Sequence, residues 1–315
     1  MPDSVEPQER PLVTLIAPAF DEAANAEALV EFFRRVRAGH PDLDFELIVV
    51  DDGSTDATGR LVRDAAAPDE AVRVLTLSRR FGSHVALSAG LASSKGDCAI
   101  SVSTDIQEPV EVIGRFLDSW LAGHDIVWGV RATRADGRWV RNLFSRRFSR
   151  VFQRFSGLHS YPAEGPSQAL LSRRVVELLT RLPERNRNLW AICAWLGFEQ
   201  ATISFHQLPR HAGQSKWSTA DRLKLMVDSI VGFSVKPFVI TLVLGLLLGS
   251  GGLIALAALL VVGLIAGSLA GWGLVLAVVF LLAGVQLTVF GGFGLYLWRV
   301  AEDTRSRPLY VLRDP

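Results

Sequence analysis

Three short clusters rich in acidic side chains each follow a run of apolar residues. They occupy residues 17–22, 49–56 and 102–109. Carboxylate oxygens bind the hydroxyls of a ribose, and they are the hard ligands that a divalent cation prefers. A single Asp-Gly-Ser sequence is equally typical of an ordinary turn or helix cap. The prediction of a carboxylate-lined ligand pocket therefore depends on the three clusters lying side by side.

The segments between these clusters alternate between predicted strands and helices. Short runs rich in Val, Ile and Leu predict strands at residues 12–17, 45–50, 72–77, 99–102 and 126–130. Helices are predicted at residues 25–38, 57–66 and 84–93. This alternation indicates a mostly parallel sheet with helices on both faces, a Rossmann-like α/β fold. In such sheets the ligand site lies beyond the carboxyl ends of the strands, where all three clusters fall.

The composition argues against several classes of function. Among 315 residues, Lys and Arg number 33 and Asp and Glu number 32, and this balance argues against a nucleic-acid partner. Cys98 and Cys193 are too few for a disulfide framework or a zinc site. We expect them to fill apolar positions in a reducing compartment. Residues 1–10 are polar, so we expect no signal peptide there.

The C-terminal part of the chain is strongly apolar. No charged residue lies between Pro237 and Trp298, and this length accommodates two membrane-spanning helices. We predict a juxtamembrane amphipathic helix at 218–236 and two transmembrane helices within 237–298. Lys and Arg flank the spans but are absent from the turn between them, so residues 1–217 and the tail at 299–315 are expected in the cytosol. A buried hairpin of a soluble domain is the alternative, and the long charge-free run disfavours it.

A series of motifs gives the chain a resemblance to a known family. The motifs are Pro18, Phe20 and Glu22; Val50 and Asp52; Ser78–Gly82; Asp105 to Gln107; Arg131; Arg141 with Ser145; and Arg-x-x-Gly-x-Ser-Lys at residues 210–216. From Leu12 to about Phe238, the chain resembles family 2 glycosyltransferases with the A-type nucleotide-sugar fold. Within them it is most similar to the polyprenyl-phosphate branch, which includes dolichyl-phosphate mannose synthase and bacterial undecaprenyl-phosphate glucosyltransferases. The fold implied is a Rossmann-like A-type domain with a C-terminal two-helix transmembrane hairpin.

The resemblance implies a role for each matched residue. Nucleotide-sugar binding would fall to Pro18, Phe20, Glu22, Val50, Asp52, Ser103, Thr104, Arg210 and Lys216. Asp105 and Gln107 would hold Mg²⁺ or Mn²⁺ at the donor diphosphate. Arg131, Arg141 and Ser145 would hold the acceptor phosphate, and with Asp105 they form the implied catalytic set.

The implied reaction is an inverting transfer of one sugar from a UDP- or GDP-sugar to a polyprenyl phosphate of the undecaprenyl or decaprenyl type. It would take place at the cytosolic face of the inner or plasma membrane. A phosphate monoester is already largely a dianion at neutral pH, so no dedicated general base is required. Gly-rich faces on the predicted spans permit helix packing between chains. The resemblance implies a homo-oligomer, with a tetramer as in bacterial relatives, and packing of these faces within the hairpin of one chain is the alternative.

The chain departs from the family pattern at several positions. Ser103 replaces the first acid of the usual Asp-x-Asp, which predicts weaker metal binding unless Glu108 or water takes its place. Arg80 and Asp21 stand where the family usually has Asn. The stretch at 166–169 does not match the Gly-Asp-Phe-Arg of many relatives, which leaves the sugar open.

Two other functions compete with this interpretation. A nucleotide-sugar-binding scaffold that lost catalysis with Ser103 would bind the donor without turnover. A processive polysaccharide synthase would usually carry Gln-x-x-Arg-Trp and more spans, whereas Arg138-Trp139 lacks the Gln.

Overall fold

The computed structural model describes residues 10–132, 158, 160–182, 188–209 and 308–313, with scattered positions between 261 and 304. The chain divides into two compact units, one formed by Met1–Met226 with Arg307–Pro315 and the other by Val227–Ser306. The described residues between 261 and 304 are helical. Within the described part of the chain, no helix has the length and apolar character to cross a membrane. Most of residues 218–298, where spans and a lead-in helix are predicted, lies outside the described residues.

The first unit is built on a mixed sheet with the strand order β3-β2-β1-β4-β6-β5-β7. Its strands are β1 (Leu12–Ala19), β2 (Asp44–Asp51), β3 (Val72–Thr76), β4 (Cys98–Ser101), β5 (Ile126–Arg131), β6 (Pro166–Ser172) and β7 (Gln200–Phe205). The described helices are the 3-10 turn η1 (Ala23–Asn25), α1 (Ala26–Gly39), α2 (Thr58–Ala65), α3 (Ser83–Ser93), α4 (Val110–Leu121), α6 (Arg173–Arg181) and α7 (Leu189–Leu196). All five predicted strands and all three predicted helices are confirmed. β6 and β7 and the later helices were not predicted, and β6 runs antiparallel to both of its neighbours.

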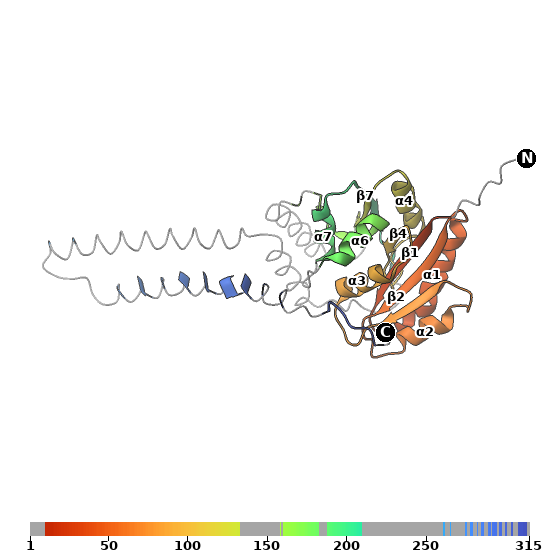
Figure 1. Ribbon diagram of the computed structural model, residues 1–315, viewed down its shortest axis with the longest axis horizontal. Helices are drawn as coiled ribbons and strands as arrows, with labels where there is room; N and C mark the ends of the chain where they lie inside the picture. The colour runs from red at the N-terminus through yellow and green to blue at the C-terminus, as the bar shows by residue number, and fades with distance from the viewer. Residues whose placement is uncertain are drawn as a thin grey trace, which may run out of the picture. The chain divides into compact units, whose positions relative to one another are not determined.

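Helices cover both faces of the sheet, with α1 and α2 on one side and α3 and α6 on the other (Figure 1). Phe33 of α1 and Phe116 of α4 pack in one core with Leu15 and Leu47, and none of these four side chains is exposed. On the other face, Gly90 of α3 lies directly on Ile16, and a Cβ atom there would collide with that side chain. Cys98 and Cys193 are buried free thiols, which agrees with their expected role as apolar fillers.

The register of β1 and β2 decides where the first two acidic clusters lie. The two strands pair in parallel from Leu12 opposite Asp44 to Ala19 opposite Asp51. β2 is apolar through Leu47–Val50 because both of its faces are covered, and none of these side chains is exposed. Since both strands end at the same level, the residues that follow them emerge side by side.

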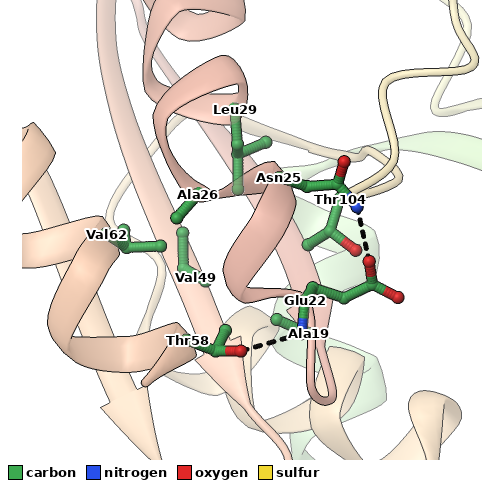
Figure 2. A pocket seen from close by; sticks show the side chains of 9 residues that line it. All are labelled: Ala19, Glu22, Asn25, Ala26, Leu29, Val49, Thr58, Val62 and Thr104. Atoms are coloured by element: carbon green, nitrogen blue, oxygen red, sulfur yellow. Dashed lines mark hydrogen bonds between the residues drawn. The ribbon is translucent and has the colours of Figure 1, made fainter. Parts of the chain in front are cut away.

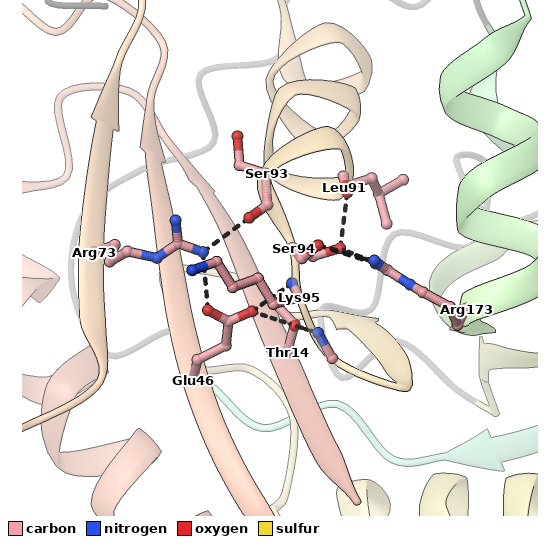
Figure 3. Close-up of polar contacts among 9 residues, drawn as sticks. Thr14, Glu46, Arg73, Leu91, Ser93, Ser94, Lys95 and Arg173 are labelled. Carbon is pink, nitrogen blue, oxygen red and sulfur yellow. Dashed lines mark hydrogen bonds and ion pairs between the residues drawn. The ribbon is translucent and has the colours of Figure 1, made fainter.

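The opposite end of the sheet is held by a buried polar network around Glu46 (Figure 3). The Glu46 carboxylate accepts hydrogen bonds from the Thr14 hydroxyl at 2.7 Å, the Lys95 backbone N–H at 2.8 Å and the Arg73 guanidinium at 2.9 Å. Burial by itself would raise the pKa of Glu46, but these three donors together lower it below its ordinary value. The network therefore ties β1, β2 and β3 to the end of α3 through one ionised carboxylate.

We predict that Glu46→Ala destabilises the folded protein by about 1–3 kcal/mol at pH 7, because buried donors lose their acceptor. The folded-state pKa of Glu46 is depressed, so its contribution is present above the unfolded pKa and disappears as the pH falls through the folded value. Urea unfolding of the full-length protein, followed by the fluorescence of buried Trp128, measures the difference. Glu31→Ala is the control, since the Glu31 side chain is 58% exposed in a 3.6 Å ion pair with Arg34. Equal losses in both variants would contradict the prediction.

Candidate active site

The loops that follow β1 and β2 interlock through hydrogen bonds. Asp52 donates its backbone N–H to the Ala19 carbonyl at 2.8 Å, and Asp21 donates its own to the Ser54 hydroxyl at 2.9 Å. The Asp21 carboxylate accepts the Thr55 backbone N–H at 2.7 Å. Asp21 has a φ of +50°, a conformation that a short side chain able to bond locally tolerates best. The first and second acidic clusters thus form one rigid surface.

All three acidic clusters contribute to a small recess between the sheet and helices α1 and α2 (Figure 2). Glu22 enters it from the first cluster, Val49 from the second and Thr104 from the third. The Glu22 backbone N–H is held by the Thr58 hydroxyl at 2.8 Å, and its carboxylate accepts from the Asn25 amide at 2.6 Å. The clusters therefore lie together as predicted, but of the residues that line this recess only Glu22 carries a carboxylate, and most of the others are apolar.

The Asp52 carboxylate fastens a third loop to this surface. Its two oxygens accept the backbone N–H groups of Phe81 at 2.7 Å and Gly82 at 2.8 Å. Burial raises the pKa of Asp52, and these two donors together with the positive charge of Arg80 offset part of that rise. Gly53, with a φ of +70°, lies so close to this loop that a Cβ would be 2.5 Å from the Arg79 carbonyl carbon.

The side chains predicted to hold the nucleotide lie around this junction. Phe20 is half-buried, and the Arg80 guanidinium lies over its ring, 4.3 Å from the centroid. Pro18 is also half-buried, whereas the Val50 side chain is fully buried and packs against α3 near Gly90. A contribution of Val50 to ligand binding is therefore indirect, through the position of the strand end.

Ser103, the residue in place of the usual first acid, is paired with Glu108. The Glu108 carboxylate accepts the Ser103 hydroxyl at 2.6 Å and the Ser103 backbone N–H at 3.2 Å. Burial raises the pKa of Glu108 to about 6, with a further rise from the charge of Asp105 and an opposing effect of Arg131. The cluster therefore keeps a second carboxylate, that of Glu108, bound to Ser103. The positive charge of Arg131 at the end of β5 lowers the pKa of this carboxylate.

Asp105 and Gln107 lie in a tight turn after β4. Asp105 is 7% exposed, and the next residue, Ile106, has a φ of +52°. The Gln107 side-chain carbonyl accepts a hydrogen bond from the Gln207 amide, and its backbone carbonyl accepts the Leu208 N–H at 2.8 Å. The turn is thereby joined to the segment that leads to Arg210.

The remaining predicted site residues are not covered by the structure. Arg141, Ser145, Arg210 and Lys216 lie outside the described residues, and their roles stay predictions.

Several residues of the site were not predicted as participants. Ser54, Thr55 and Thr58 bind the first loop, and Gln207 binds Gln107. Ser and Thr directly after Asp-Asp-Gly are types that bond to nearby backbone in turns and caps, so a signal existed for Ser54 and Thr55. Gln207 carries no comparable signal.

The chemistry of the donor set fits a divalent cation carried by a diphosphate. Among the described residues, no group of three or more His, Cys, Asp or Glu side chains could hold a metal alone. Mg²⁺ is commonly bound by one or two carboxylates together with substrate phosphates rather than by an all-protein cage. Asp105, with Gln107 two residues further along the same turn, matches that smaller requirement.

Comparison with known proteins assigns the family. The model of glycosyl transferase family 2 matches residues 14–179, more than half of the chain and all three acidic clusters. The chain belongs to glycosyl transferase family 2. It is therefore a glycosyltransferase, and its sheet is that of the A-type fold predicted from the sequence.

Individual relatives extend the match beyond the family model. An uncharacterized glycosyltransferase of Synechocystis is 32% identical, with 96% of this chain and 95% of the relative covered. The bactoprenol glucosyl transferase of Shigella phage SfX is also 32% identical, over 96% of this chain and 99% of the relative. Among solved structures, glucosyl-3-phosphoglycerate synthase from Mycobacterium tuberculosis has a TM-score of 0.50 at 21% identity, covering 70% of this chain and 77% of that protein. This last likeness concerns the fold.

The buried Glu108 predicts an unusual pH dependence of stability. Because its folded-state pKa of about 6 lies above the ordinary 4.5, its contribution is full below pH 4.5 and is lost as the pH rises through 6. We expect Glu108→Gln to lack this loss, so its stability relative to the wild type should rise by about 2 kcal/mol between pH 4.5 and 7.5. Urea unfolding at several pH values measures this difference. Glu111→Gln, at an exposed position of α4, is the control. A pH-dependent difference in Glu108→Gln no larger than that of this control would refute the assignment.

Proposed function

We propose that this glycosyltransferase moves a single sugar from a UDP- or GDP-sugar to a polyprenyl phosphate, with inversion at the anomeric carbon. The observation that carries the proposal is the full-length similarity to a bactoprenol glucosyl transferase. That similarity covers 96% of the chain and so extends past residue 179, where the family model ends. It includes Arg210, Lys216 and the apolar segment at 237–298.

The site supplies groups suited to the donor half of this reaction. Phe20 offers a half-buried aromatic ring, and Glu22 offers a carboxylate that lines the recess. Asp52 contributes by holding the loop that carries Arg80 over that ring. As the bond between sugar and diphosphate breaks, negative charge grows on the leaving nucleoside diphosphate. Asp105 and Gln107 would hold Mg²⁺ or Mn²⁺, which neutralises that charge when bound. Arg210 and Lys216 are proposed to approach the same phosphates, and the contact between Gln107 and Gln207 starts their segment next to this turn.

The acceptor half of the reaction is proposed to depend on Arg131 with Arg141 and Ser145. Arg131 ends β5, and its charge acts on Glu108, so a cation stands at the edge of the third cluster. A guanidinium binds phosphate oxygens in a bidentate geometry. The acceptor phosphate oxygen forms the new bond to the anomeric carbon, and the nucleoside diphosphate departs with the electrons of the old one.

We further propose that the enzyme is a multi-pass protein of the inner or plasma membrane, with its catalytic unit in the cytosol and a homo-oligomeric assembly. Exposed apolar side chains among the described residues of the second unit support a lipid contact, because extensive exposed apolar surface marks an interaction site. Examples are Ile265, Val279 and Phe290, which are 82%, 53% and 59% exposed.

A donor panel tests the reaction directly. Full-length protein is offered radiolabelled UDP- and GDP-sugars with undecaprenyl phosphate in the presence of Mg²⁺, Mn²⁺ or EDTA, and label in the lipid fraction is counted. We expect transfer from one donor, abolished by EDTA, and reduced about 100-fold or more in Asp105→Asn because stabilisation of the leaving group is lost. Asp118→Asn, an exposed position on α4, should retain wild-type transfer.

The other outcomes are equally informative. Transfer that survives EDTA would retain the reaction and remove the metal assignment. Nucleotide-sugar binding without transfer from any donor would instead favour the scaffold interpretation. Products longer than one sugar would favour a processive synthase.

A further inference from the structure

The C-terminal segment 308–313 pairs with the sheet of the first unit. It forms an antiparallel bridge in which Leu312 lies opposite Leu77. The Ser78 N–H donates to the Val311 carbonyl and the Arg313 N–H to the Thr76 carbonyl, both at 2.8 Å. β3 is the edge strand of the sheet, so this segment occupies the place of one further strand beside its end.

Leu77, which pairs with this segment, is also bound to β2 on its other side. The Leu77 N–H donates to the Asp51 carbonyl at 2.8 Å, and the Leu77 side chain is fully buried. The hydrogen bonds of the segment reach Thr76 and Ser78, at and just beyond the end of β3.

The loop held in this way continues directly into the candidate donor site. After Ser78 come Arg79 and Arg80, whose backbone lies against Gly53, and then Phe81 and Gly82, whose N–H groups bind Asp52. Arg80 lies over the ring of Phe20. Residues 78–82, which we call the donor loop, therefore connect the C-terminal segment to two of the residues assigned to the nucleotide.

We propose that residues 308–313 act as a positioning element that holds the donor loop and thereby the nucleotide-binding site. The segment fixes the start of the loop through Ser78. This fixes the two N–H groups that orient the Asp52 carboxylate and the guanidinium that covers Phe20. The proposal rests on the proposed function, since it takes the ligand at Asp52 and Phe20 to be a nucleoside diphosphate.

Position 313 offers a matched pair of variants. Arg313→Pro removes the N–H that donates to Thr76, whereas Arg313→Ala keeps it and removes only an exposed side chain. A third variant ends the chain after Arg307. Binding of UDP and of GDP, each with Mg²⁺ or Mn²⁺, is measured by calorimetry on the full-length protein and on each variant. KM values for the donor and for undecaprenyl phosphate are measured in parallel.

Trypsin cleavage after Arg79 and Arg80, located by mass spectrometry, reports on the donor loop independently of activity. We expect Arg313→Pro and the truncated chain to bind the nucleotide about 5- to 30-fold more weakly, the range that one or two hydrogen bonds support. Their donor KM should rise while the acceptor KM stays constant, and cleavage in the donor loop should accelerate. Arg313→Ala should match the wild type in all four measurements.

Three results would overturn the proposal. Unchanged nucleotide binding and unchanged cleavage in Arg313→Pro and the truncated chain would mean that the segment only covers the sheet edge. An equal rise of both KM values, together with a lower melting temperature, would indicate a general loss of stability. Absence of nucleotide binding in the wild type would remove the proposed function as well, whereas wild-type binding with insensitive variants would remove only the inference.

Discussion

A single buried carboxylate, that of Asp52, connects the parts of the donor site. Its backbone is bound to the end of β1, and its two oxygens hold the backbone of Phe81 and Gly82. Three loops from three strands therefore depend on one residue that is 3% exposed. The hydrogen bonds from these donors offset the cost of burying the Asp52 carboxylate, and loss of a donor would leave part of that cost uncompensated. β1 and β2 end at the same level, Gly53 has a positive φ, and the loop of Arg79 packs closely against it. These features hold the donors in place around Asp52.

The third acidic cluster shows how a chain can lose an acid at one position and retain the charge nearby. Ser103 stands where the family usually has Asp, yet its hydroxyl binds Glu108, five residues further on. The carboxylate of Glu108 is more buried than a ligand facing solvent would be, and its raised pKa reflects that burial. The site consequently has one carboxylate, Asp105, at the turn and a second one, Glu108, which binds Ser103 and whose pKa the charge of Arg131 lowers.

The sequence was sufficient for the part of the fold that repeats a simple pattern. β1 to β5 and α1 to α3 follow the alternation of buried strands and amphipathic helices, so their order and the meeting of the three clusters could be predicted. β6 was missed because it is an antiparallel strand that begins with Pro166 and carries only a short apolar run. β7 lies at the sheet edge and alternates between exposed and buried positions, a weaker signal than a continuous apolar run. Contacts such as Phe81 with Asp52 and Gln207 with Gln107 join residues 29 and 100 positions apart. No local pattern encodes them.

The return of the chain to the first unit has a consequence for the order of synthesis. The first unit ends its main segment at Met226 and regains residues 307–315 only after the second unit. A ribosome adds residues at about 5–20 per second, so residues 308–313 emerge roughly 10–50 s after the strand end that they hold. The sheet edge next to Leu77 can therefore be completed only after residues 227–306 have been made. The catalytic unit can therefore be completed only after the apolar unit has been synthesised. A nascent chain interrupted before Arg307 lacks the segment that pairs with the edge of its own sheet.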